Sequence, residues 1–317
     1  MTIDTSAVRP AGAGVTVRGF RAGDEGPILG AMLAALERGE REGMEPFQLE
    51  HAAERLPFDP ASCAVAEIDG ELAGWVIPAD DDLVVVPHFR RQGVGRALVQ
   101  AGREIVGDAG LDRLRLWVRR DAASEAFATA CGLQYASSLW QMRLRGPAMA
   151  LVPEPVFDAD TRLRTLRAGA DEGPFVALVN RIFLDHLSPI VLNEAEVQRV
   201  HATPGFDPTA VLVVEDAKTA SMIAFCRVHL FTAGDGTPSG EIRLLGVDRA
   251  WRRRGLGRAI TEWGVAELRR RGAQSVVLAV EGRNEGALRL YEQLGFRRGT
   301  EWRHWTIAAW RGNPPKE

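Results

Sequence analysis

The sequence has little cysteine and no long apolar segment. Its 317 residues include three cysteines, Cys63, Cys131 and Cys226, and none has a histidine or second cysteine at metal-ligand spacing. We therefore expect no metal site, and a reducing, cytoplasmic compartment fits this usage. No apolar run approaches the roughly 20 residues that a membrane helix needs. The start, residues 1–14, has no apolar core of the kind found in secretory signals, so we expect a disordered leader there.

Neither sign of charge dominates the chain. Lys and Arg number 39 and Asp and Glu number 42, which gives a formal net charge of −3. This balance gives no reason to expect nucleic acid or an anionic membrane as a partner. Apolar residues make up 46% and charged residues 26%, the mixture of an ordinary globular protein, and the length is comfortable for two domains.

Two segments of the first half recur in the second half. Residues 21–27, which read Arg-Ala-Gly-Asp-Glu-Gly-Pro, reappear with one insertion at 167–174, where Asp24 and Asp171 are predicted to be helix N-caps. Residues 90–97 match residues 252–259, with the shared pattern Arg-Arg-x-Gly-x-Gly-Arg-Ala. A stretch with three prolines separates the halves and is typical of a linker. We predict two tandem domains, residues 15–146 and 161–311, joined by a linker at 147–160.

Both halves show the same order of predicted elements. In the first, strands at 64–68 and 72–77 flank Asp69-Gly70, a type I′ hairpin signal. The second half predicts strands at 211–215, 222–230, 242–247, 275–280 and near 303–308, with helices at 255–271 and 284–294. Strands dominate early and helices alternate with strands later. The expected fold class is therefore α/β, with a mixed, mostly antiparallel sheet in each half that is flanked by helices on both faces.

An arginine- and glycine-rich loop follows the predicted strand 242–247. At the start of a helix the backbone N–H groups are unsatisfied, and glycine lets a ligand approach them closely. The neighbouring arginines add positive charge. The spacing is neither that of a P-loop nor GxGxxG, but the arrangement predicts a pyrophosphate site, and the first half repeats it.

A second motif, Asn-x-x-Ala-x-x-Leu-Tyr-x-x-x-Gly-Phe, covers residues 284–296. Together with the Arg-x-x-Gly-x-Gly loop it resembles the GNAT superfamily of N-acetyltransferases. The resemblance implies that acetyl-CoA is held between two splaying strands, that its pantetheine amides extend the sheet, and that acyl transfer to an amine is direct. It places cofactor contacts in the second half at Leu245, Gly246, Val247, Arg252, Arg253, Arg254, Gly255, Leu256, Gly257, Arg258 and Asn284, and in the first half at Val84, Val85, Val86, Arg91, Gln92, Gly93, Val94, Gly95 and Arg96.

The resemblance also implies catalytic residues in the second half. Tyr291, one of two tyrosines in the chain, occupies the position of the family's thiolate acid. Alternatively, Tyr291 only packs at the sheet edge, and Asn284 only caps its helix. Glu241 stands where tandem relatives have a candidate base, with Glu281 as the fallback. A strand N–H near Gly246 or Val247 is suited to bind the oxyanion that forms at the thioester carbonyl.

The first half departs from the second motif. Ala128 falls at the position of Tyr291 and Asp121 at the position of Asn284, so the first half keeps the loop but lacks the acid. It either binds acyl-CoA without turnover or only braces the second half. The tandem layout is similar to the mycothiol synthase family, but His186-Leu187-Ser188-Pro189 and His229 differ from that family's usual residues at acceptor-facing positions.

Four activities are compatible with these features. The leading prediction is acetylation of a primary amine on a small molecule, followed by mycothiol synthase-like acetylation of a cysteinyl amine. A non-catalytic acyl-CoA-binding module and acetylation of protein amines are the other two. The intact segment around Tyr291 argues against a pure binding module, which would need only the loop. The acceptor, the acyl chain length and the oligomeric state stay open.

Overall fold

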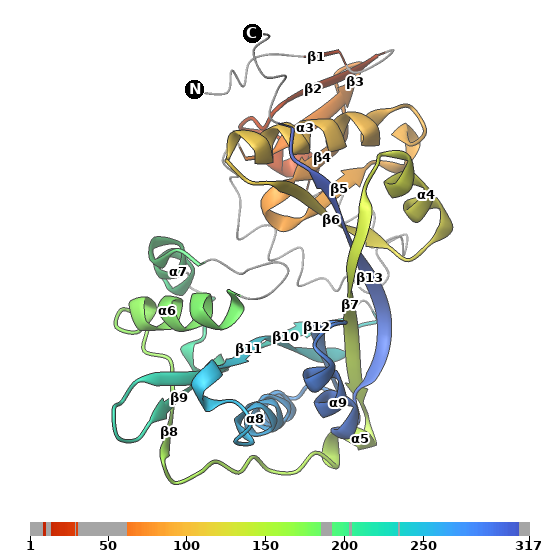
Figure 1. Cartoon of the computed structure of the whole chain (residues 1–317). Coiled ribbons are helices and arrows are strands. Elements are labelled where there is room, and N and C mark those ends of the chain that lie inside the picture. Colours follow the sequence, from red (N-terminus) through yellow and green to blue (C-terminus); the bar gives the residue numbers. More distant parts are fainter. Residues whose placement is uncertain are drawn as a thin grey trace. The chain divides into compact units, whose positions relative to one another are not determined.

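The computed structural model describes residues 9–10, 14–28, 30, 62–184, 192–202, 205–233 and 235–310. Contacts divide the chain into two compact units. The first contains Met1–Trp140, Glu281–Arg283 and Thr300–Glu317, and the second contains Gln141–Val280 and Asn284–Gly299. Figure 1 colours the helices and strands by their position along the chain. Among the described residues, no helix is long and apolar enough to cross a membrane.

Five strands form a sheet in the first unit, and each pairs antiparallel with the next. They are β1 (Arg9–Pro10), β2 (Val15–Gly19), β3 (Ala64–Ile68), β4 (Glu71–Ile77) and β5 (Asp82–Val85). The predicted turn between β3 and β4 is confirmed, because Asp69 and Gly70 both have a positive φ, 51° and 80°. Strand β1 lies within the predicted leader. Its pairing with the edge of β2 corrects the expectation of disorder at Arg9 and Pro10.

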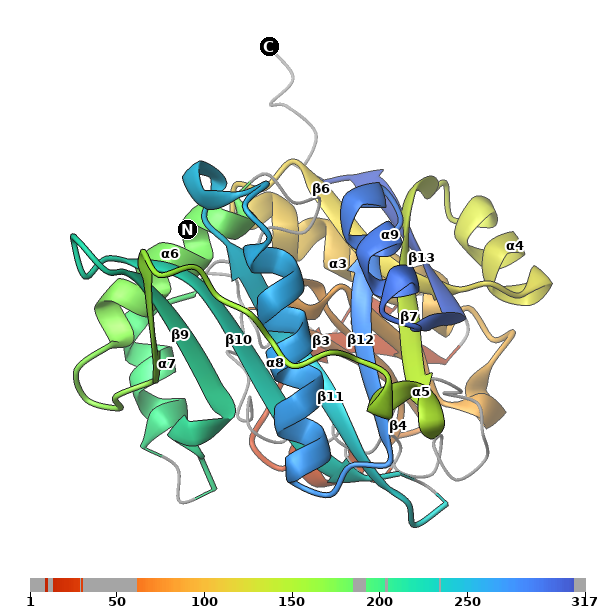
Figure 2. The same ribbon diagram turned by 90° about the horizontal axis from the view of Figure 1, so that it is seen from below.

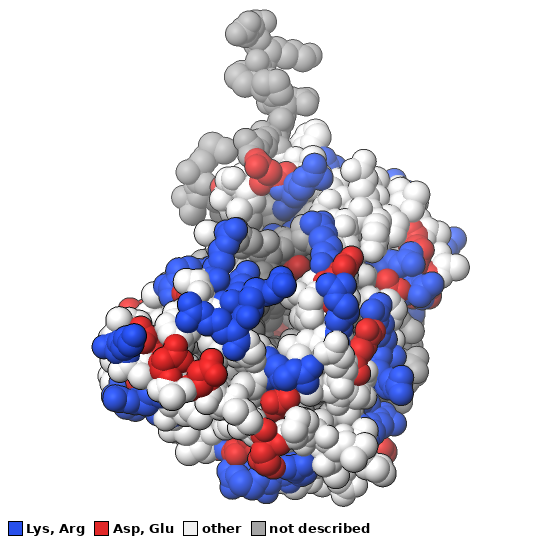
Figure 3. All heavy atoms as spheres, turned by 60° about the horizontal axis from the view of Figure 1, so that its bottom comes forward, with Lys and Arg blue, Asp and Glu red and all other residues white. Residues whose placement is uncertain are grey.

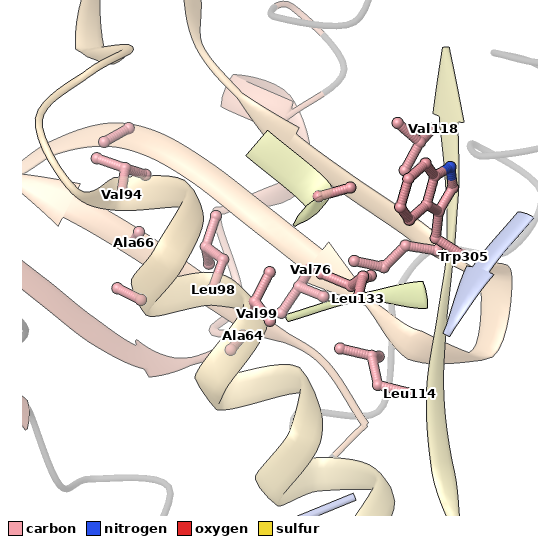
Figure 4. Close-up of a cluster of buried hydrophobic side chains, with 14 of the residues drawn as sticks. Ala64, Ala66, Val76, Val94, Leu98, Val99, Leu114, Val118, Leu133 and Trp305 are labelled. Atoms are coloured by element: carbon pink, nitrogen blue, oxygen red, sulfur yellow. The ribbon is translucent and has the colours of Figure 1, made fainter. Parts of the chain in front are cut away.

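Helix α3 (Val94–Asp108) supplies much of the apolar core of the first unit. Its buried residues recur at helical spacing, and Figure 4 shows Val94, Leu98 and Val99 directed toward side chains of β3 and β4. Trp305, far along the sequence, packs into the same cluster. The remaining elements of this half are β6 (Arg113–Arg119), α4 (Ala122–Ala130), β7 (Gln134–Arg145) and the 3₁₀ turns Pro78–Asp80 and Pro87–Phe89.

The second unit repeats the pattern with longer strands. Its sheet runs in the order β7-β12-β11-β10-β9-β8. The elements are α5 (Pro147–Ala150), β8 (Thr161–Thr165), α6 (Glu172–Phe183), α7 (Glu194–His201), β9 (Val211–Asp216), β10 (Met222–Thr232), β11 (Pro238–Val247), α8 (Leu256–Arg270), β12 (Ser275–Glu281), α9 (Glu285–Gln293) and β13 (Arg297–Ala308), with 3₁₀ turns at Pro208–Ala210 and Arg249–Trp251. The predicted linker, 147–160, contains α5 and the buried side chains of Met149 and Val152, so part of it is packed.

Helices cover both faces of the second sheet. A Cβ at Gly240 of β11 would lie 2.5 Å from Leu268 of α8, and a Cβ at Gly246 of the same strand would lie 2.8 Å from Ile182 of α6. The two helices therefore pack on opposite faces of β11. Figure 2 shows α8 crossing β10 and β11. This arrangement confirms the mixed α/β fold that the sequence predicts.

The contiguous domains expected from the repeats differ from the observed units at two strands. Residues Trp302–Ala308 of β13 pair antiparallel with β6 in the first unit. Residues 141–145 of β7 belong to the second unit, whose sheet β7 joins beside β12. After β13 the backbone continues along α3, where Trp310 N–H donates to the Arg103 carbonyl at 2.9 Å. Each half of the sequence thus completes its unit with strand residues from the other half.

The repeated Arg-Ala-Gly segments form the same ion-pair network in both units. Arg18 contacts Asp24 at 2.7 Å and also Glu67, and Arg164 contacts Glu215 at 2.7 Å and also Asp171. Asp171 occupies the predicted N-cap position of α6, but its carboxylate accepts from Arg164 and from Arg167 N–H and not from the helix. Burial alone raises the pKa of Asp171, but the hydrogen bonds from Arg167 and Arg164 outweigh it and lower that pKa.

Candidate active site

The loop between β11 and α8 exposes a row of backbone donors. Arg253 and Gly255 have positive φ, 69° and 83°, and Gly255 is the N-cap of α8. Alternating right- and left-handed residues turn successive N–H groups into one concavity, which is the geometry of an anion-binding nest. In the part of the chain that the structure describes, no acceptor takes the N–H groups of residues 253–257. The positive end of the α8 helix dipole lies at this loop and also attracts an anion.

The arginine side chains of the loop make different contacts. Arg252 Nε donates to the Val247 carbonyl at 3.2 Å, which ties the loop to the end of β11. Arg254 lies 4.6 Å from the centre of the Trp251 ring, and Arg258 donates to Gln293 of α9 at 2.7 Å. Arg253 is exposed. Lys and Arg side chains gather on the face that Figure 3 shows.

Strands β11 and β12 separate at the end that leads into this loop. Their parallel pairing runs from Ser239↔Ser275 to Ile242↔Leu278 and ends there, whereas β11 continues to Val247. On its other edge β11 stays paired with β10 as far as Ala224↔Val247. The predicted cofactor residues Leu245, Gly246 and Val247 therefore lie on a strand edge that β12 has left open, as the resemblance implies.

A β-bulge at Arg243 changes which side chains face α6. Arg227 of β10 pairs with Leu244, but the next residue, Val228, pairs with Ile242, so Arg243 is the extra residue. In a regular strand Gly240 and Gly246 would face the same side, because their positions differ by an even number; the bulge explains why they contact helices on opposite faces. Glu241 is the neighbour of Gly240 and so lies on the α6 face.

Tyr291 lies in α9 and is 5% exposed. Its ring centre is 5.9 Å from that of Phe296. Burial raises the pKa of the phenol, and the nearby Cys226 thiol raises it further. Cys226 packs toward α8, where a Cβ at Gly264 would approach its sulfur to 3.1 Å. Tyr291 therefore belongs to the α8 face, and Glu241 to the α6 face. The open strand edge of β11 lies between these faces.

Asn284 caps α9. Its side chain accepts from Ala287 N–H at 3.1 Å, and Asp121 caps α4 in the same way by accepting from Ser124 N–H at 2.8 Å. The cap explains why a short polar residue stands at both positions. Glu281, the fallback base, is the last residue of β12. The segment 186–189, expected to face the acceptor, lies outside the described residues.

The first unit has the same loop without the same surroundings. Arg91 and Gly93 repeat the positive φ values, 64° and 88°, and Arg90 Nε donates to the Val85 carbonyl at 3.4 Å. The predicted strand positions Val84 and Val85 pair with Trp75 and Gly74 of β4, without a bulge. Val86 N–H donates to the Ala73 carbonyl, so the backbone follows β4 up to the loop.

Side chains around the first loop also differ. A Cβ at Gly95 would lie 2.8 Å from the Phe127 ring, whereas a Cβ at Gly257 would have only Leu290 within 4 Å, at 3.9 Å. Gly95 is thus required by packing, and Gly257 leaves room for a ligand. Ala128, at the position of Tyr291, is fully buried.

The sequence analysis assigns no role to two arginines that lie near Glu241. Arg227 and Arg243 lie on the α6 face together with His229, which is the register partner of Glu241. The signal was present, because charged residues at alternate positions interrupt otherwise apolar strands. The bulge that brings Arg243 to this face has no such signature.

Known proteins are similar to most of this chain in sequence. The sequence matches the model of the acetyltransferase (GNAT) family at residues 31–133 and 182–296. It is 36% identical to the mycothiol acetyltransferase of Thermobispora bispora, over 88% of this chain and 94% of that protein. The mycothiol acetyltransferase of Salinispora arenicola is also 36% identical, over 87% and 91% of the two chains.

Solved structures show the same fold. A tandem GNAT protein from the clavulanic acid biosynthesis pathway superimposes with a TM-score of 0.69 at 20% identity, over 94% of this chain and all of that one. A GCN5-related N-acetyltransferase from Sphaerobacter thermophilus gives 0.64 at 23% identity, over 93% and 96%. These identities support the fold alone.

Proposed function

Because the chain belongs to the acetyltransferase (GNAT) family and is an acyltransferase, we propose that its second half moves an acetyl group from acetyl-CoA directly to a primary amine of a small molecule. The observation that carries this proposal is the open edge of β11, which ends in a loop whose N–H groups at residues 253–257 have no acceptor among the described residues. Family members use acetyl-CoA, and the site offers a place for each of its parts.

The loop and the strand edge suit different parts of acetyl-CoA. The pyrophosphate is an anion that accepts several hydrogen bonds, as the nest at Arg253–Gly257 requires. The pantetheine arm carries two amides, which can pair with the unoccupied edge at Leu245–Val247 as an extra strand would. The room beside Gly257 lets the pyrophosphate come close to the backbone.

Two side chains move protons in this proposal. Glu241, on the α6 face, takes a proton from the ammonium group of the acceptor, which leaves the neutral amine free to attack the thioester carbonyl. A strand N–H near Gly246 or Val247 stabilises the negative charge that develops on the carbonyl oxygen. Tyr291, from the α8 face, protonates the departing thiolate. Its raised pKa keeps the phenol protonated at neutral pH, as an acid requires.

The relatives give a second candidate for the acceptor. Proteins named mycothiol acetyltransferases match almost the full chain, which favours a cysteinyl amine of the mycothiol synthase type. The first half has the loop and an edge strand, β5, but it lacks the tyrosine and the bulge, so it does not contribute chemistry in this proposal. A non-catalytic acyl-CoA-binding module would not need a buried, protonated Tyr291 opposite Glu241.

The proposal is tested at Gly257. Gly257→Glu puts a carboxylate where the pyrophosphate would lie, while the protein itself leaves room for the new Cβ. We expect the acetyl-CoA Kd, measured by calorimetry, to rise more than about tenfold, which corresponds to about 1.4 kcal/mol. Gly205→Glu is the matched control, since Gly205 also has open space around it in the same unit. Equal affinities for Gly257→Glu and the control would refute the proposed cofactor site.

A further inference from the structure

The loop that we propose to hold the pyrophosphate begins at Asp248, the residue that follows β11. The Asp248 N–H donates to the Ile223 carbonyl of β10 at 2.8 Å. Its carboxylate accepts from the Ala250 N–H at 3.0 Å and so caps the 3₁₀ turn Arg249–Trp251. The Trp251 N–H in turn donates to the Asp248 carbonyl at 2.8 Å. Asp248 thus joins the end of the strand to the first turn of the loop.

An arginine of α6 binds the other oxygen of this carboxylate. Arg181 Nε and one terminal nitrogen of its guanidinium each lie 2.7 Å from Oδ2 of Asp248. Burial alone raises the pKa of Asp248, but the Ala250 N–H and Arg181 outweigh it and lower that pKa, so the carboxylate stays ionised at neutral pH. The next residue of α6, Ile182, contacts Gly246, where a Cβ would lie 2.8 Å from it. Successive residues of α6 therefore hold the strand end and the start of the loop.

The first unit supports its loop by a different contact. Its 3₁₀ turn Pro87–Phe89 has Val86 as N-cap, so no carboxylate stands at that position. The Phe127 ring instead lies against Gly95, where a Cβ would be 2.8 Å from it. The matching space beside Gly257 in the second unit is open, which leaves room for a phosphate but removes this support.

An anion-binding loop works best when its N–H groups point to one place before the ligand arrives. Each part of the backbone that has to be ordered on binding lowers the affinity. An ion pair at the start of the loop can supply this order without filling the ligand space, because Asp248 is held from the α6 side, whereas Gly257 belongs to α8. A lone carboxylate in an anion-binding loop would weaken binding, and Arg181 also balances that charge.

We propose that Arg181 and Asp248 are positioning residues for acetyl-CoA, and that their ion pair holds the loop at residues 253–257 in the conformation that binds the pyrophosphate. Arg181 acts through Asp248 and need not touch the cofactor. The inference rests on the proposed cofactor site, but it concerns a residue of α6, outside the loop and the strand that form that site. It also gives a reason for an aspartate where the first unit has Val86.

The test measures the acetyl-CoA Kd by calorimetry in single and double variants. Arg181→Gln removes the ion pair at a side chain that is 54% exposed, so the fold should survive. Asp248→Asn removes the charge and keeps an oxygen for the Ala250 N–H. Because the hydrogen bonds are charge-assisted but partly exposed to water, we expect each variant to raise the Kd about three- to tenfold. The double variant should bind no worse than the single variant with the higher Kd, because both changes break one pair.

The sign of the Asp248→Asn effect separates positioning from charge alone. If only charge mattered, loss of a negative charge from this loop would tighten the binding of an anion, whereas loss of the ion pair weakens it. Arg181→Lys should recover part of the loss, because it restores the charge without the contact through two nitrogens. Arg270→Gln is the matched control. Arg270 binds Glu267 through Nε and a terminal nitrogen at the C-terminal end of α8, and its substitution should leave the Kd unchanged.

Three results would overturn the inference. They are a Kd in Arg181→Gln within about twofold of the unmodified value; unchanged or tighter binding in Asp248→Asn; or additive losses in the double variant, which would mean that the two residues act separately. A thermal melt checks that each variant is folded, and if Arg181→Gln is not, the sign for Asp248→Asn decides alone. Normal binding in these variants beside weak binding in Gly257→Glu would remove only this inference. Normal binding in Gly257→Glu would remove the proposed cofactor site itself.

Discussion

Tyr291→Phe separates a catalytic hydroxyl from a packed ring. The substitution keeps the ring, which is 5% exposed and packs against Phe296, and removes only the oxygen. The hydroxyl has no hydrogen-bond partner among the described residues, so the change breaks no internal hydrogen bond. We expect the free energy of unfolding to stay within about 1 kcal/mol.

The catalytic effect should be much larger than the effect on stability. General acids contribute about 10²- to 10⁴-fold, and a thiolate is a fair leaving group that needs less help, so we expect kcat to fall roughly 10- to 100-fold. This is about 1.4–2.7 kcal/mol of transition-state stabilisation. Single-turnover acetyl transfer measures the chemical step, calorimetry measures acetyl-CoA affinity, and a thermal melt measures stability. An unchanged single-turnover rate would show that the ring only packs and that water protonates the thiolate.

The raised pKa of Tyr291 gives the same variant a pH signature. An ordinary tyrosine releases its proton near pH 10, and burial moves that of Tyr291 higher in the folded state. Above pH 10 the unfolded chain therefore binds fewer protons than the folded chain, and stability falls as pH rises. The phenylalanine variant lacks this loss. We expect its melting temperature to decline less than that of the unmodified protein above pH 10 and to match it at pH 7.

Two further predictions concern the base and the exchanged strand. Glu241→Gln keeps the size of the side chain and removes its charge, so kcat at neutral pH should fall about 100-fold or more. Part of the activity should return at high pH, where the acceptor amine loses its own proton. If the ratio of kcat between the unmodified protein and the variant were the same at every pH, Glu241 would not be the base. Residues 1–146 expressed alone lack β13, the partner of β6, and should show no cooperative melt by circular dichroism, whereas a cooperative melt would mean that β13 is dispensable to the first unit.

The loops could be predicted from the sequence because their conformation depends on local residues. The pattern Arg-Arg-x-Gly occurs twice, and in both copies the second arginine and the glycine have positive φ. The Asp69-Gly70 turn was predictable for the same reason. The segments at residues 21 and 167 are recognisable as repeats, and Asp171 occupies the predicted N-cap position of α6, but its carboxylate makes no cap hydrogen bond. Their aspartates bind Arg18 and Arg164, whose second acidic partners, Glu67 and Glu215, lie about 50 residues away in sequence.

Features set by long-range pairing could not be predicted. The bulge at Arg243 depends on which β10 residue meets which β11 residue, and nothing in residues 238–247 alone marks it. The exchange of β7 and β13 has no local signature either, because both segments alternate as ordinary strands. Contiguous domain boundaries were therefore the natural expectation, although the last strand pairs with β6 of the first unit.

Comparison of the two halves separates the features that both share from those that belong to the second half alone. Both units keep the ion-pair network, the left-handed loop and the arginine that ties the loop to the preceding strand. These shared features stabilise the scaffold of both units and do not distinguish the half that we propose to be active from the other half. The differences lie in the strand before the loop: β11 has ten residues and a bulge, whereas β5 has four and follows β4 without one. The bulge in the longer strand brings Glu241 and Arg243 to one face. The loop motif therefore identifies the fold, and the strand before it, together with Tyr291, distinguishes the half that we expect to transfer the acetyl group.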